Sequence, residues 1–251
     1  MKEDLLIMKI ESLIDGVIIR RVNRFIVEIS RNRESILAHN TNTGRLLDFI
    51  RPGRRALLKM INGEKIKYRL IAIEDLEGSF SIVDTLTQGI VFEELVRRGF
   101  IYYLRGCRIS RRNPRAIDSV LDYQIECDNN TIYVETKSAV FRGPEGEAMY
   151  PDAPTKRGER HVKTLIELKD KGFDTALIFI AAMKNVKCFK PFEEVDPLLS
   201  NLIYQALKKN VLVKSLSIYM REDGSIYLEN PDIPLCTNWI ESMRRREFEE
   251  I

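Results

Sequence analysis

The stretch SVLDYQIECDNNTIYVETKSAV (residues 119–140) decides the fold of the second half of the chain. Residues 119–125 and 131–140 are rich in β-branched and aromatic side chains, and the polar CDNN separates them, which predicts two paired strands. Side chains alternate along a strand, so Glu135 and Lys137 are expected on one face. Asp118 precedes the first strand and is predicted to bring a second carboxylate close to Glu135, although the sequence leaves the hairpin register open.

Two carboxylates and a lysine in this pattern suit phosphodiester hydrolysis. Carboxylate oxygens hold Mg²⁺ or Mn²⁺, the metal activates water, and an ammonium group stabilises charge on the reacting phosphate. The predicted catalytic residues are Asp118, Glu135 and Lys137, and the predicted metal ligands are Asp118, Glu135 and Glu94, with Glu93 as an alternative to Glu94. The competing interpretation is a surface salt bridge on a sheet, which contributes little.

The sequence after this hairpin alternates between helix and strand. Thr155 can cap a helix that ends near Gly172. TALIFIAAM (175–183) is an almost wholly apolar strand, which predicts cover on both of its faces. A helix over 197–209 and a strand over 211–220 follow, so partly parallel pairing is expected. The tail from residue 221 reads as irregular, with a short helix near its end.

The sequence before the hairpin reads as short strands without a long helix. Asn62-Gly63 suggests a type I′ hairpin turn. The predicted strands cover residues 17–31, 34–38, 55–61, 65–75 and 80–83. Such a series indicates a small OB-like β-barrel over residues 1–85. A helical period over 86–99 then marks the start of a second domain, 86–251.

Positive charge is concentrated in two segments. Residues 20–69 hold 13 Lys and Arg against 4 Asp and Glu, and residues 97–117 hold seven arginines and no acid. This segregation predicts a DNA-binding surface that contacts the phosphate backbone rather than stacking on bases. The predicted DNA-binding residues are Arg20, Arg21, Arg24, Arg45, Arg51, Arg54, Arg55, Arg111, Arg112, Arg157 and His161. The alternative is a solvated basic face without a partner.

Several protein classes are disfavoured by composition. No apolar run is long enough to cross a membrane, and acids interrupt the apolar N-terminus, which argues against a signal peptide. The four cysteines form no CxxC pair, so we expect buried free thiols in a cytoplasmic protein. High charge with only three glutamines suggests a heat-adapted source. Nothing in the sequence indicates an oligomeric state.

The sequence resembles the sugar fermentation stimulation protein (SfsA) family. The stretches that carry the resemblance are RVNRF (21–25), AHNTNTGRL (38–46), YRLIAIE (68–74), VDT (83–85), ID (117–118), YVETKS (133–138), PDAPTKRGERH (151–161) and PFEEVDPLL (191–199). The chain departs from the family pattern at Arg115-Ala116-Ile117-Asp118, where Ser-Arg-Ile-Asp is usual, and at Arg160, where lysine is common.

The resemblance implies an OB-like N-terminal domain and a restriction-endonuclease-like, PD-(D/E)xK, C-terminal domain. It also implies nonspecific DNA binding and a regulatory link to sugar use, and it aligns Asp118, Glu135 and Lys137 with the nuclease signature. Three functions follow from these observations: a DNA-binding protein with an idle site, an active Mg²⁺- or Mn²⁺-dependent nuclease, or a sugar-linked module with an incidental basic face. The absence of a Gly-rich phosphate loop or a Ser/His/Asp set disfavours the third.

Overall fold

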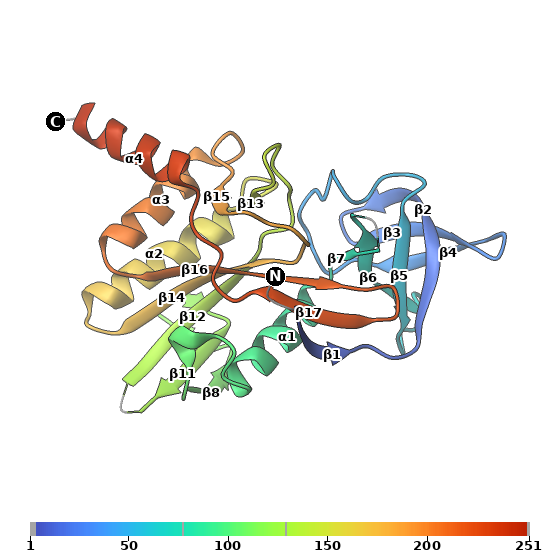
Figure 1. The fold of residues 1–251 in the computed structure, drawn as a ribbon, viewed down its shortest axis with the longest axis horizontal. Coiled ribbons are helices and arrows are strands. Elements are labelled where there is room, and N and C mark those ends of the chain that lie inside the picture. Colours follow the sequence, from blue (N-terminus) through green and yellow to red (C-terminus); the bar gives the residue numbers. More distant parts are fainter. Residues whose placement is uncertain (1–3, 77, 129, 250–251) are drawn as a thin grey trace.

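A computed structural model describes residues 4–76, 78–128 and 130–249, and it consists of a barrel joined to a layered α/β part (Figure 1). The barrel strands are β2 (Leu13–Asn23), β3 (Ile26–Arg31), β4 (Glu34–His39), β5 (Arg55–Met60) and β6 (Tyr68–Glu74). Antiparallel pairing joins β4, β3, β2, β5 and β6 in that order, and parallel pairing of β4 with β6 closes the ring. The predicted OB-like barrel is confirmed.

Alternation of side chains builds the interior of the barrel. On β3, Val27 and Ile29 are fully buried, while the side chains on either side of each of them in sequence are less buried. The connection from β5 to β6 differs from the prediction. Met60 pairs with Tyr68, so Asn62-Gly63 lies inside a longer loop, and Gly63 lacks the positive φ that a type I′ turn requires.

The second part is a mixed sheet covered by helices. Its three parallel strands are β12 (Asn130–Ser138), β14 (Asp174–Ala181) and β16 (Leu212–Met220). All residues of β14 after Asp174 are buried, as the apolar sequence predicts. The helices α2 (Lys156–Asp170) and α3 (Pro197–Lys208) pack on β14 and β16 respectively. The mixed α/β fold expected of this half is therefore confirmed.

Antiparallel strands extend the sheet at both edges. On one side, β12 pairs with β11 (Tyr123–Cys127), which pairs with β8 (Arg108–Arg112). On the other side, β16 pairs with β17 (Ser225–Asn230) and with β7 (Phe80–Ile82), which also pairs with β6 of the barrel. One continuous sheet therefore runs from the barrel into the α/β part.

The helix α1 (Thr85–Arg97) follows β7 directly, and Asp84 caps it by accepting a hydrogen bond from the backbone N–H of Thr87 at 3.0 Å. A division of the chain at residue 85 coincides with this change in architecture. The first strand, β1 (Leu5–Lys9), nevertheless lies outside the barrel, because it pairs with β17.

The C-terminal tail is more regular than predicted, because it contains β17 and the helix α4 (Thr237–Glu249). Small elements complete the described chain: η1 (Tyr102–Leu104), and the pairs β9 (Arg115–Ala116) with β10 (Ser119–Val120) and β13 (Ala148–Tyr150) with β15 (Phe189–Pro191). Within the described residues no helix is long and apolar enough to cross a bilayer.

The expectation of free thiols is wrong, because all four cysteines are paired. Disulfides join Cys107 to Cys127 and Cys188 to Cys236, with Cα–Cα distances of 4.2 and 5.1 Å. The partners are 20 and 48 residues apart in sequence, so only the tertiary fold brings them together.

Candidate active site

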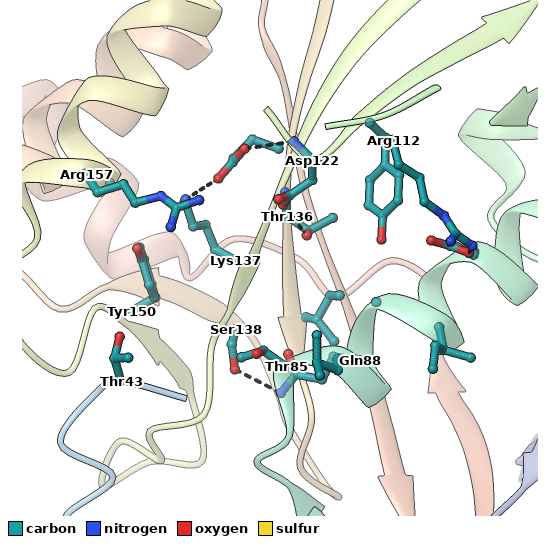
Figure 2. A pocket seen from close by; sticks show the side chains of 18 of the residues that line it. Thr43, Thr85, Gln88, Arg112, Asp122, Thr136, Lys137, Ser138, Tyr150 and Arg157 are labelled. Atoms are coloured by element: carbon teal, nitrogen blue, oxygen red, sulfur yellow. Dashed lines mark hydrogen bonds and ion pairs between the residues drawn. The ribbon is translucent and has the colours of Figure 1, made fainter. Parts of the chain in front are cut away.

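A cavity of about 650 Å³ opens between α1, α2, the ends of β11 and β12, and the loop that follows β4. Figure 2 shows Thr85 and Gln88 of α1 on one side of it, with Arg157 of α2 and Tyr150 on the other. Lys137 and Thr136 project from β12 between these two sides. The barrel contributes Thr43 and Arg69 to the lining, so both parts of the fold form the cavity.

Two acids lie next to each other on the wall formed by β11 and β12. Tyr123 pairs with Val134, and one further step along the same register brings Asp122 opposite Glu135. The backbone N–H of Asp122 donates to Glu135 Oε2 at 3.2 Å. The Asp122 carboxylate accepts two hydrogen bonds from Thr136, from its backbone N–H at 2.8 Å and its hydroxyl at 2.6 Å. These contacts fix both carboxylates at the cavity wall.

Two further side chains contact Glu135 on its other oxygen. Glu135 is only 2% exposed, and its Oε1 contacts both Lys137 Nζ and His161 Nδ1. Arg157 Nε donates to His161 Nε2 at 3.4 Å, and the other ring nitrogen, Nδ1, faces Glu135. Arg157, His161 and Glu135 therefore form a chain of hydrogen bonds from the cavity into the protein.

The charges of this group shift its pKa values in opposite directions. Burial, and then the charge of Glu135, raise the pKa of Asp122. Burial alone would also raise the pKa of Glu135, but Lys137 and His161 outweigh it and lower that pKa. Burial alone would lower the pKa of Lys137, but the carboxylate of Glu135 outweighs it and raises that pKa. Glu135 and Lys137 are thus a buried ion pair, and Asp122 is the acid that holds its charge less firmly.

The α1 side of the cavity is held by a polar network. Gln88 is buried, and its side-chain amide donates to Ser138 Oγ at 2.9 Å and to the carbonyl of Ile82 at 2.7 Å. One turn further along, Glu93 lines the cavity and forms an ion pair with Arg112 of β8. Side-chain contacts therefore hold α1 against β12 and β8 on this side of the cavity.

The structure corrects two of the predicted acids. Asp118 is exposed in the turn between β9 and β10 and does not line the cavity, whereas Asp122 does. The strand predicted over 119–125 is in fact two strands, β10 and β11, with a break before Asp122. Glu94 faces away and pairs with Arg97 at 2.6 Å, and Glu93 takes its place at the cavity. The predicted metal set Asp118, Glu135 and Glu94 is therefore not assembled.

The predicted DNA-binding residues fall into distinct groups. Arg112 and Arg157 line the cavity, but His161 is 1% exposed and cannot reach a phosphate directly. Three arginines are held in ion pairs: Arg20 with Glu28, Arg51 with Asp48, and Arg55 with both Glu74 and Glu222. The remaining members either contact backbone carbonyls (Arg21 and Arg54), lie over the Phe25 ring (Arg24), or are exposed (Arg45 and Arg111).

Sequence reasoning missed one feature at the edge of the cavity, the docking of the loop after β4. Asp152 accepts a hydrogen bond from the backbone N–H of Leu46 at 2.6 Å. A Cβ atom on Gly44 would lie 2.3 Å from an oxygen of Asp152, so a larger residue there would displace this carboxylate. The segments TGR (43–45) and PDAP (151–154) therefore lie side by side at the edge of the site, although more than 100 residues separate them in sequence.

Comparisons with known proteins agree with this architecture. A family model described as the sugar fermentation stimulation protein RE domain matches residues 86–224, and one described as the SfsA N-terminal OB domain matches residues 19–82. A sugar fermentation stimulation protein homolog of Pyrococcus furiosus is 43% identical over 88% of this chain and 95% of its own length. One of Archaeoglobus fulgidus is 36% identical over 90% of this chain and 97% of its own length.

The fold is also similar to a solved structure, that of Pyrococcus furiosus SfsA in complex with Ca²⁺. The TM-score is 0.89 at 39% sequence identity, and the match covers 92% of this chain and 99% of the other.

Proposed function

Because this chain belongs to the sugar fermentation stimulation protein family, we propose that it binds DNA and hydrolyses its phosphodiester bonds with the help of a divalent metal ion. The observation that carries the proposal is the placement of Asp122, Glu135 and Lys137 side by side on the wall of one cavity. Arg157 and Arg112 line the same cavity and supply charge for phosphate contacts.

The donor set suits a hard divalent cation. Asp122 and Glu135 offer carboxylate oxygens. Burial, and then repulsion by Glu135, raise the pKa of Asp122, and a cation between the two carboxylates would relieve the repulsion. Within the described residues no three His, Cys, Asp or Glu side chains are arranged to hold a metal ion, so water would complete the coordination shell, as is common for Mg²⁺. Ca²⁺ in the Pyrococcus furiosus relative supports a divalent ion in this family, and for catalysis we propose Mg²⁺ or Mn²⁺.

Each residue has a role in this proposal. Asp122 and Glu135 would hold the metal, which supplies an activated water and neutralises charge on the scissile phosphate. Lys137 would orient the attacking water or stabilise the charge that develops on phosphorus-bound oxygens. Arg157 would bind a phosphate at the mouth of the cavity, while its Nε keeps His161 directed at Glu135.

A second candidate is a DNA-binding protein whose carboxylate site is idle. The observation that favours it is the full compensation of Glu135 by Lys137 and His161 without a metal. Both candidates require DNA binding that weakens steeply as salt is added, because neutralised phosphates release counterions.

One assay separates the two candidates. Wild type, Asp122→Asn, Lys137→Ala and Asp118→Asn are incubated with single-stranded, duplex and branched DNA in Mg²⁺ or Mn²⁺. Asp118→Asn is the matched control, because it removes an exposed acid outside the cavity. A nuclease predicts cleavage by wild type and Asp118→Asn, and a loss of about 100-fold or more in the other two. DNA binding without cleavage of any substrate would favour the idle site instead.

A further inference from the structure

The helix α1 presents two aliphatic side chains to the cavity rather than to the core. Leu86 is 54% exposed and Ile90 is 51% exposed, and both line the cavity. They are four residues apart and therefore share one face of the helix, whereas Val91, Phe92 and Leu95 are buried on the other side. Single exposed aliphatic residues are ordinary on a surface, but here two adjacent ones form a wall.

The opposite side of the cavity is ionic. Arg157 lies across from the α1 side in Figure 2, and Lys137 projects from β12 between them, on the same wall of the cavity as Asp122. The cavity therefore has a charged face that suits a phosphate. On the α1 side, beside the polar contacts of Gln88 and Glu93, Leu86 and Ile90 form a smaller apolar face that suits the flat surface of a nucleobase. The cavity volume of about 650 Å³ is within the range of roughly 300–1,000 Å³ typical of pockets for small organic ligands.

Duplex DNA cannot use both faces at once. In a duplex the bases are stacked inside, and a protein that contacts the backbone meets only phosphate and sugar. An unpaired nucleotide can turn its base out of the strand. When its phosphate lies at the charged face, the base can then reach the apolar face.

We propose that Leu86 and Ile90 form a subsite for the base of an unpaired nucleotide, so that the preferred ligand of the cavity is single-stranded DNA or an unpaired strand end. This inference rests on the proposed function, because it takes the phosphate-binding face from it. The inference adds to the proposed function a preferred substrate class, unpaired DNA, and two residues that determine this preference, Leu86 and Ile90. Neither residue takes part in the hydrolysis itself.

The test compares two probes that carry the same phosphates. Fluorescence anisotropy measures the Kd of the full-length protein for a thymidine oligomer of about ten nucleotides and for an abasic oligomer of equal length. Both are measured in Ca²⁺, with a gel to check that the probes stay intact. Wild type should bind the thymidine oligomer about tenfold more tightly, from the apolar area that the base covers. Leu86→Ser with Ile90→Ser should bring the ratio close to one and leave the abasic Kd unchanged.

Leu198→Ser is the matched control, because Leu198 is also an exposed leucine at the second position of its helix, α3, and does not line the cavity. It should keep the wild-type ratio, and thermal melting checks that every variant is folded. Equal binding of both probes by wild type, or a ratio that survives in the double variant, overturns the subsite while the proposed function stands. Failure of wild type to bind either probe also overturns the subsite, and failure to bind duplex DNA as well overturns the proposed function itself.

Discussion

Replacing His161 by leucine tests the hydrogen-bonded chain behind the carboxylates. Leucine fills a similar volume but cannot donate to Glu135, which is 2% exposed. A hydrogen bond to a charged group contributes about 1.5–3 kcal/mol, and Glu135 keeps the contacts from Lys137 and from the Asp122 N–H. We therefore expect the free energy of unfolding to fall by about 2 kcal/mol.

Urea denaturation of His161→Leu, Glu135→Gln and the double variant measures this coupling. The cycle should give an interaction energy of about 1–2 kcal/mol, because His161→Leu removes the donor of this contact and Glu135→Gln removes the negative charge of its acceptor. His39→Leu, at the other histidine of the chain, is the control and should show no coupling to Glu135→Gln. An interaction energy below about 0.5 kcal/mol for His161 would refute the reasoning.

Three further predictions concern the joined architecture and the ligand. Arg142→Met should lower the free energy of unfolding by about 3 kcal/mol in urea denaturation, because the nearly buried Asp75, 2.5 Å away, loses its cationic partner and keeps only the hydrogen bond from Ser81; an unchanged midpoint would contradict this. Loss of the Cys188–Cys236 disulfide, which closes a 48-residue separation, should cost about 4 kcal/mol, and mass spectrometry of the wild type should find no free thiol at either position. DNA binding should lose at least about tenfold in affinity between 50 and 200 mM salt, and salt-independent binding would exclude phosphate contact.

Elements with a strong local pattern were predictable from the sequence. The apolar run that makes up most of β14 predicted its burial. Thr155 and Gly172 predicted the ends of α2, because Thr155 accepts a hydrogen bond from the N–H of Gly158 and Gly172 has a φ of 88°. Glu135 and Lys137 could be placed together because they lie two residues apart on one strand. Such features depend on neighbours in sequence.

The choice of Asp122 over Asp118 depends on the hairpin register, which the sequence leaves open. A break between β10 and β11 shifts the strand start by four residues, and no local pattern marks it. The choice of Glu93 over Glu94 was accessible in principle. Leu86, Ile90 and Glu93 follow helical spacing on one face of α1, and all three line the cavity. The disulfides and the paired arginines required tertiary contacts.

The contacts around the loop after β4 argue that the barrel is a fixed wall of the site and not a tethered binding module. Thr41 donates to Asp84 at 2.7 Å, Asn42 donates to Ser138 at 3.3 Å, and Asp152 holds the backbone of Leu46. Thr43, between these anchors, lines the cavity. Because β7 also carries the sheet from the barrel to β16, independent motion of the barrel would break several partly buried hydrogen bonds at once. If the chain binds DNA as proposed, a strand that contacts the barrel would therefore be presented to Asp122 and Glu135 in a single geometry, set by folding rather than by a hinge.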